Sequence, residues 1–217
     1  MTKTIDRQRQ VTLEARILEF QQFIEDIAIS IKRVDARRPQ AANARTGVAY
    51  QPGIGPHSET QAVALLVGEL QQQFGGRYSG MVQTNIPYPK GRQKCDLCIG
   101  TPPSWDWAIE IKMLRLMGDN GKPNDNMLMH ILSPYPNDRS ALTDCVKLVQ
   151  SGLPGRMAIV IYGFDYPSLP MDPAIEAFET LASRWVCLGA RCVSHYADLV
   201  HPIHVAGRVF GWDVTPR

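Results

Sequence analysis

Residues 93–112 read QKCDLCIGTPPSWDWAIEIK, and this stretch decides the expected fold. Two short strand-like runs flank a Gly-Thr-Pro-Pro turn, which predicts a β-hairpin. Because side chains alternate along a strand, Asp96 is expected on one face of the first run, and Glu110 and Lys112 on one face of the second. Two carboxylates and an ammonium on an otherwise apolar hairpin are costly to bury, so the pattern indicates a functional site.

The chemistry of these side chains points to a metal-dependent reaction. Asp96 and Glu110 offer the oxygen ligands that Mg²⁺ prefers. Lys112 could orient or help deprotonate a water at the metal and steady negative charge on a phosphate. The alternative is an ordinary ion pair between Glu110 and Lys112 on a solvated face.

Asp96 followed by a strand carrying Glu110-Ile111-Lys112 resembles the signature of the PD-(D/E)XK nuclease superfamily. Cys95 stands where the family has its first proline. The resemblance implies a restriction-endonuclease-like fold, with an αβββαβ core over roughly residues 57–163, a mixed central sheet flanked by helices, and an N-terminal helical extension. We therefore expect an α/β protein with an extension over residues 1–50 and a nuclease-like domain over residues 51–217.

The resemblance also implies roles for individual residues. Asp96, Glu110 and the backbone carbonyl of Ile111 would bind Mg²⁺, for which Mn²⁺ could substitute, and Lys112 would position the attacking water. The first core helix of many members supplies a further glutamate, and Glu59 matches that placement as an auxiliary ligand. Glu59 could equally complement the dipole of its helix. The implied activity is Mg²⁺-dependent hydrolysis of DNA phosphodiester bonds by an endonuclease of the restriction or defence type. The alternative is a catalytically silent DNA-binding or subunit-interaction module.

Candidate DNA contacts come from basic residues in connecting segments. Lys94 lies in the hairpin, Arg37 and Arg38 follow the first predicted helix, Lys122 lies within a polar loop over residues 117–137, and Arg139 follows that loop. These side chains are expected to touch phosphates. Arg37 and Arg38 could instead form a solvated helix end.

Apolar spacing predicts the remaining elements. Helices are expected over residues 11–34, 58–74, 138–150 and 173–188, and strands over 77–87, 93–99, 105–116, 157–162, 191–199 and 207–214. The first helix carries a heptad-like seam that includes Leu13 and Ile17; it could pack on the core or join a homodimer. The continuous apolar run over 157–162 predicts a buried central strand.

Other functional classes find less support in the sequence. Cys95 and Cys98 are expected on opposite strand faces, which favours buried thiols over a zinc site with Cys187 and Cys192. His201-Pro-Ile-His204 offers two imidazoles, but Pro202 predicts an extended loop and no carboxylate is expected to accompany them, so a metal site there is not expected. No phosphate-binding glycine loop is present, so no nucleotide cofactor is expected.

Composition is typical of a folded protein, with 44% hydrophobic and 20% charged residues among 217. The net charge of +2 neither requires nor excludes nucleic acid, because a local basic groove matters more than the sum. No apolar run is long enough to span a membrane, five cysteines suggest reduced thiols, and the polar N-terminus does not resemble a signal peptide. A cytoplasmic location is therefore expected.

Overall fold

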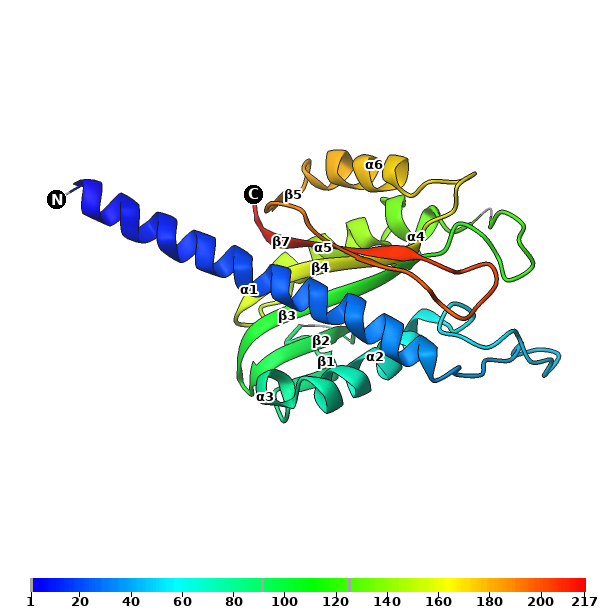
Figure 1. Cartoon of the computed structure of the whole chain (residues 1–217). Coiled ribbons are helices and arrows are strands. Elements are labelled where there is room, and N and C mark those ends of the chain that lie inside the picture. The colour runs from blue at the N-terminus through cyan, green and yellow to red at the C-terminus, as the bar shows by residue number, and fades with distance from the viewer. Residues whose placement is uncertain (1, 91, 125) are drawn as a thin grey trace.

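A mixed seven-stranded sheet, with helices on both faces, forms the centre of the molecule (Figure 1). The computed structural model describes residues 2–90, 92–124 and 126–217, with side chains described from residue 19 onward in these ranges. In chain order the elements are α1 (Thr2–Ala36), α2 (Glu59–Gln73), α3 (Gly75–Tyr78), β1 (Val82–Pro87), β2 (Lys94–Thr101), β3 (Ser104–Leu114), α4 (Met129–Leu132), the 3₁₀ helix η1 (Pro136–Asp138), α5 (Ala141–Gln150), β4 (Arg156–Phe164), α6 (Asp172–Ala182), β5 (Val186–Leu188), β6 (Cys192–Tyr196) and β7 (Gly207–Pro216).

The strand order is β1-β2-β3-β4-β7-β5, and β6 also pairs with β7. β1, β2 and β3 form an antiparallel meander, β3 and β4 are parallel, and β7 runs antiparallel to β4, β5 and β6. The chain between β3 and β4 contains α4 and α5, which supplies the long crossover that a parallel pair requires. The α/β class and the mixed sheet flanked by helices are thus as expected.

Strand β4 occupies the interior of the sheet, between β3 and β7. Its residues from Ala158 to Phe164 are all buried, because both faces of the strand are covered. This explains why its sequence is continuously apolar instead of alternating. The predicted central strand over residues 157–162 is confirmed.

Helices α1 and α2 cover one face of the sheet, and α4, α5 and α6 cover the other (Figure 1). Most apolar side chains of α1 from Phe20 to Val34 belong to the main core, as the packing interpretation of this helix requires, and Ile29 alone among them is exposed. Leu13 and Ile17 lie outside the residues whose side chains are described, and the homodimer stays a prediction.

Helix α2 begins with the capping box that the sequence predicts. The hydroxyl of Ser58 accepts a hydrogen bond from the Gln61 amide, and the Gln61 side chain accepts one from the Ser58 amide. Two backbone donors at the helix start are satisfied in this way. The cap fixes the first residue of the helix, Glu59, in place.

Two elements differ from the expectation. Residues 77–78 belong to the short helix α3, because Arg77 and Tyr78 both donate to the buried carboxylate of Asp26 on α1, at 2.8 and 2.7 Å. Strand β1 therefore starts only at Val82. The helix expected over 173–188 ends at Ala182, because residues 186–188 pair with the edge of β7 as strand β5.

No described helix combines the length and the apolar character that a membrane crossing needs.

Candidate active site

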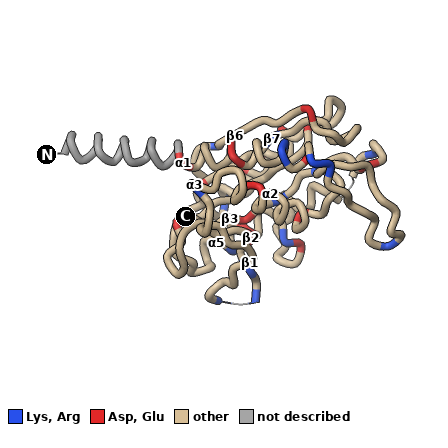
Figure 2. The backbone as a smooth tube through the Cα atoms, turned by 60° about the horizontal axis from the view of Figure 1, so that its bottom comes forward, with Lys and Arg blue, Asp and Glu red and all other residues tan. Residues whose placement is uncertain are grey.

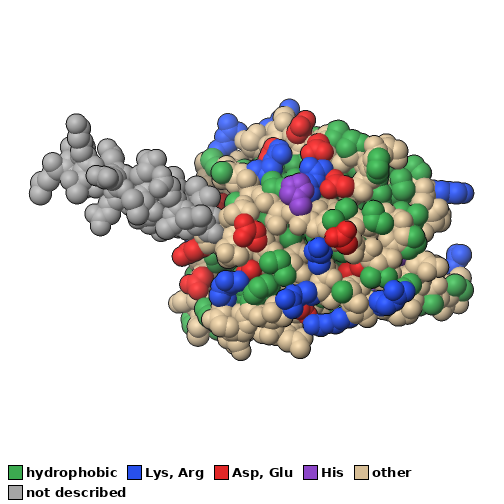
Figure 3. All heavy atoms as spheres, viewed as in Figure 1, with side chains coloured by type: hydrophobic (Ala, Val, Ile, Leu, Met, Phe, Trp, Pro, Cys, Tyr) green, Lys and Arg blue, Asp and Glu red, His purple; other side chains and the backbone are tan. Residues whose placement is uncertain are grey.

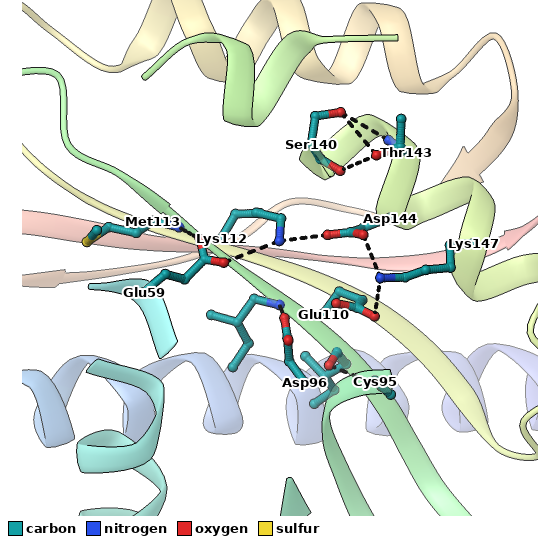
Figure 4. A network of polar contacts seen from close by, with 12 residues as sticks. Glu59, Cys95, Asp96, Glu110, Lys112, Met113, Ser140, Thr143, Asp144 and Lys147 are labelled. Atoms are coloured by element: carbon teal, nitrogen blue, oxygen red, sulfur yellow. Dashed lines mark hydrogen bonds and ion pairs between the residues drawn. The ribbon is translucent and has the colours of Figure 1, made fainter. Parts of the chain in front are cut away.

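Side chains from four elements converge on one buried polar cluster (Figure 4). Strand β2 supplies Asp96, strand β3 supplies Glu110 and Lys112, and helices α2 and α5 supply Glu59 and Asp144. The pairing of β2 with β3 and the alternation of side chains place the acids of both strands on the face that α5 covers. The four residues predicted from sequence as catalytic are therefore neighbours in space.

Asp96 lies where β2 separates from β3. The pairing of the two strands ends at Leu97 and Ile109, so the next amide on this edge of β3, that of Ile111, has no partner in β2. The Asp96 carboxylate accepts a hydrogen bond from this amide at 2.9 Å. Because the N–H and C=O of one strand residue point to the same side, the Ile111 carbonyl also faces this opening.

Glu59 also accepts a hydrogen bond from a backbone amide of β3, two residues further along the strand than the amide bound by Asp96. Its carboxylate accepts a hydrogen bond from the Met113 amide at 2.8 Å and lies 3.3 Å from the Lys112 ammonium. Burial raises the pKa of Glu59, and Lys112 and the Met113 amide partly offset that rise. A buried backbone donor must find an acceptor, so the gap between the strands is itself a reason for two acids to gather here.

Lys112 is enclosed by carboxylates. Its side chain is 9% exposed, and its ammonium lies 2.8 Å from Asp144 in addition to the contact with Glu59. Burial alone would lower the pKa of Lys112, but Asp144 and Glu59 outweigh it and raise the pKa above its ordinary value. Lys112 therefore stays protonated at neutral pH in this arrangement.

Glu110 is the most deeply buried acid of the cluster, at 1% exposure. It accepts a hydrogen bond from the Tyr88 hydroxyl and lies 2.8 Å from the Lys147 ammonium. Burial, together with the charges of Asp144 and Asp96, raises its pKa well above the ordinary value, and Lys147 offsets only part of this rise. A further cation near Glu110 would relieve the same penalty.

The cluster carries an excess of negative charge. When all groups are ionised, four carboxylates face two ammonium groups, a formal charge of −4 + 2 = −2. All the acids are oxygen donors of the kind that hard divalent cations prefer. The members are Glu59, Asp96, Glu110 and Asp144 with Lys112 and Lys147.

A cleft of about 1460 Å³ opens above the cluster. Its rim is basic on two sides: Lys90 and Arg92 come from the β1–β2 connection and Lys94 from the start of β2, and Arg139 and Arg184 come from the helical side. Figure 2 shows the basic positions that flank the tip of the β1–β2 connection. On the face shown in Figure 3, by contrast, acidic and basic side chains are interspersed. The cleft thus combines an acidic floor with a cationic rim.

The predicted DNA contacts divide into two groups. Lys94 and Arg139 line the cleft. Arg37, Arg38 and Lys122 are not among its lining residues, and Arg37 pairs with the buried Glu69 at 2.5 Å. For these three, a role in DNA binding stays a prediction without support from this cleft.

The sequence predicts the two cysteines of the hairpin on opposite strand faces, and this prediction is wrong. Cys95 and Cys98 both belong to a buried cluster with Tyr88 and Trp105. The pairing of β2 with β3 ends at Leu97, so Cys95 is held only by its pairing with Ile86 of β1. Both thiols are free, and among the described residues no cysteine joins a group of three potential metal ligands.

A second polar group lies elsewhere and corrects the expectation that no carboxylate accompanies the paired histidines. Asp119, in the segment after β3, lies 2.9 Å from Nε2 of His204 and 3.9 Å from Nε2 of His201. In the described part of the chain, these are the only three candidate ligand side chains gathered within 4.8 Å of one another. The sequence alone does not indicate this group, because Asp119 and His201 are 82 residues apart in the chain (201 − 119 = 82).

The geometry of this second group favours hydrogen bonding over metal binding. The two imidazole rings are stacked, with centroids 4.5 Å apart and planes 20° apart, whereas a metal ion must lie near the plane of each ring. Nδ1 of His201 accepts from the backbone amides of Ile203 and His204, which places the proton on Nε2. Joint ligation would therefore require a ring to turn. In this structure the hydrogen bond between Asp119 and His204 connects the segment after β3 to the segment between β6 and β7.

Three residues of the site are not predicted from the sequence: Asp144 and Lys147 of the cluster, and Tyr88, which donates a hydrogen bond to Glu110. Asp144 and Lys147 lie three residues apart on α5 and form an ion pair at 2.7 Å. A signal was present, because Asp144 interrupts the buried stripe of α5 formed by Ala141, Leu142 and Cys145. A buried acid in such a stripe requires a cationic partner.

Comparisons with protein-family models, with curated proteins and with solved structures give no match for this chain. Function must therefore be argued from the site.

Proposed function

We propose that the protein is a metal-dependent DNA endonuclease of the restriction or defence type, with a restriction-endonuclease-like core. The observation that carries the proposal is the convergence of Asp96, Glu110 and Lys112 on the floor of a cleft with a basic rim. Two carboxylates and an ammonium beneath a cationic groove suit a reaction on a phosphodiester backbone.

The order of elements supports the same proposal. The succession α2, β1, β2, β3, α5 and β4 corresponds to αβββαβ, with the antiparallel meander and the parallel β3–β4 pair in one sheet. The inserted α3, α4 and η1 are each three or four residues long and leave this order unchanged. Agreement between motif and topology counts for more than either alone.

The donor set fits a hard divalent cation such as Mg²⁺ or Mn²⁺. Asp96 and Glu110 would hold it with the Ile111 carbonyl, which faces the opening between β2 and β3, and Glu59 is an auxiliary ligand. The cluster's formal excess of two negative charges matches one such ion. When bound, the cation lowers the pKa of water and offsets charge on the phosphate.

The protein's own side chains then have separate tasks. Lys112 stays protonated because carboxylates surround it, so it orients water and stabilises negative charge on the phosphate instead of accepting a proton. Lys147 and Tyr88 hold the Glu110 carboxylate in place. The basic rim binds the DNA backbone on either side of the cleft.

A second candidate is a catalytically silent DNA-binding or subunit-interaction module. It is favoured by one observation: each of the acids already has a protein donor or cation, so the cluster is satisfied without metal. A silent module would bind DNA equally well in Mg²⁺ and in EDTA and would leave it intact.

Cleavage of supercoiled plasmid distinguishes the two candidates. Wild type should nick or linearise the plasmid in Mg²⁺ and not in EDTA, and Glu110→Gln should be inactive. Glu176→Gln, which removes an exposed acid of α6 outside the cleft, is the matched control and should cut like wild type. DNA binding without cleavage by wild type in Mg²⁺ or Mn²⁺ would contradict the nuclease and favour the module.

A further inference from the structure

The cleft extends beyond the acidic cluster along helix α5. Thr143, Lys147 and Gln150 line it at helical spacing, and the lining continues to Arg184 and Trp185 in the segment between α6 and β5. The substrate groove is therefore longer than the catalytic centre. Its lining includes one large exposed aromatic ring, Trp185.

Trp185 is exposed at 42%, unlike the other tryptophans. Trp105 and Trp212 are buried, and Trp107 stacks on Phe20 with centroids 4.8 Å apart. No described ring contact or side-chain hydrogen bond involves Trp185. Trp185 is thus an exposed ring that lines the cleft with the basic rim. An aromatic side chain in a positively charged groove is the arrangement on which the bases of single-stranded nucleic acids stack.

The segment that carries Trp185 is held firmly. The amides of Arg184 and Trp185 bond to the carbonyls of Leu181 and Ala182 at 3.1 and 2.9 Å. The Arg217 guanidinium also donates to the carbonyls of Ser183 and Arg184, at 3.2 and 3.0 Å. The indole is thus presented from a fixed backbone, which lowers the entropic cost of binding a flat partner.

We infer that Trp185 is a stacking site for one nucleobase of the substrate, with Arg184 beside it to contact a phosphate. This inference rests on the proposed function, since it places a base in the groove whose phosphodiester reaches the acidic cluster. A base inside a duplex has both faces covered by its neighbours, so only an unpaired, terminal or extruded base can offer a face to the indole. The substrate class is therefore DNA with an unpaired segment at or near the scissile bond.

The test measures binding of fluorescein-labelled oligonucleotides by anisotropy, in Ca²⁺, with a single strand, a blunt duplex and a duplex with an unpaired bubble. Trp185→Ala should weaken binding of the single strand and the bubble about 10-fold, and binding of the blunt duplex less than 2-fold, because stacking of one base on an aromatic ring is lost. Trp185→Phe should retain most of the affinity. Tyr135→Ala, an exposed aromatic residue outside the cleft lining, is the matched control and should behave like wild type.

Each result has a defined meaning. The stacking site would be overturned if wild type and Trp185→Ala bound all three oligonucleotides with equal affinity. It would also be overturned if Trp185→Ala lost as much affinity for the blunt duplex as for the single strand. Neither result would contradict the proposed nuclease activity. Failure of wild type to bind or cut any nucleic acid would overturn the proposed function and this inference with it. A Trp185-dependent preference for single-stranded RNA would support the stacking site and overturn DNA as the substrate. A thermal melt of each variant checks that it is folded.

Discussion

The cation that we propose between Asp96 and Glu110 should stabilise the protein measurably. The cluster has a formal charge of −2, and burial keeps the pKa of Glu110 well above its ordinary value. A ligand that binds only the folded state adds RT ln(1 + [L]/Kd), which is about 1.4 kcal/mol at a concentration ten times Kd. For a chain of this size that corresponds to a rise in Tm of roughly 3–6 °C.

Differential scanning fluorimetry measures this shift directly, with Mg²⁺ or Mn²⁺ between about 0.1 and 20 mM and NaCl at matched ionic strength as the salt control. The shift should disappear in Asp96→Asn and in Glu110→Gln. Asp119→Asn is the matched control, because Asp119 belongs to the other cluster of potential ligands, and it should keep the shift. A shift that survives in Asp96→Asn but vanishes in Asp119→Asn would refute the assignment and place the cation beside His201 and His204.

Three further predictions concern single side chains. Lys112→Met should reduce plasmid cleavage at least about 100-fold while preserving the Mg²⁺-induced rise in Tm, because it removes a charge that acts on the phosphate; cleavage near the wild-type rate would contradict this role. Glu110 holds its proton more tightly in the folded than in the unfolded protein, so its contribution to metal-free stability is greatest below pH ~4.3 and falls as the pH rises towards the folded pKa. In EDTA, Glu110→Gln should therefore unfold at a higher temperature than wild type at pH 8 and at a similar temperature at pH 4, and the opposite ordering would be inconsistent with the raised pKa. Ile161→Ala, in the fully buried strand β4, should lower the free energy of unfolding by about 2–5 kcal/mol in urea titrations, and a loss below about 1 kcal/mol would show that β4 is not central to the core.

Three of the four site residues predicted from sequence lie on one hairpin, and the fourth, Glu59, is the first residue of α2. Strand alternation suffices to place Glu110 and Lys112 on one face, and the short turn brings Asp96 to the same place. The apolar run of β4 and the capping box at Ser58 are likewise local patterns, so they predict a central strand and a helix start correctly.

The parts that could not be predicted depend on contacts between distant segments. Asp144 and Lys147 reach the cluster only because α5 packs against β3, more than thirty residues after Glu110 (144 − 110 = 34). The position of Cys95 depends on where β2 leaves the ladder, which its own sequence does not indicate. Helix α3 forms where a strand was expected, because Asp26 on α1 binds Arg77 and Tyr78.

We propose that the cation required for cleavage lies between Asp96 and Glu110. The most direct test is anomalous diffraction from crystals of the protein soaked in Mn²⁺. We expect an anomalous peak within coordination distance of the Asp96 and Glu110 carboxylates and the Ile111 carbonyl. A well-ordered peak at Asp119, His201 and His204, with none at Asp96 and Glu110, would contradict it.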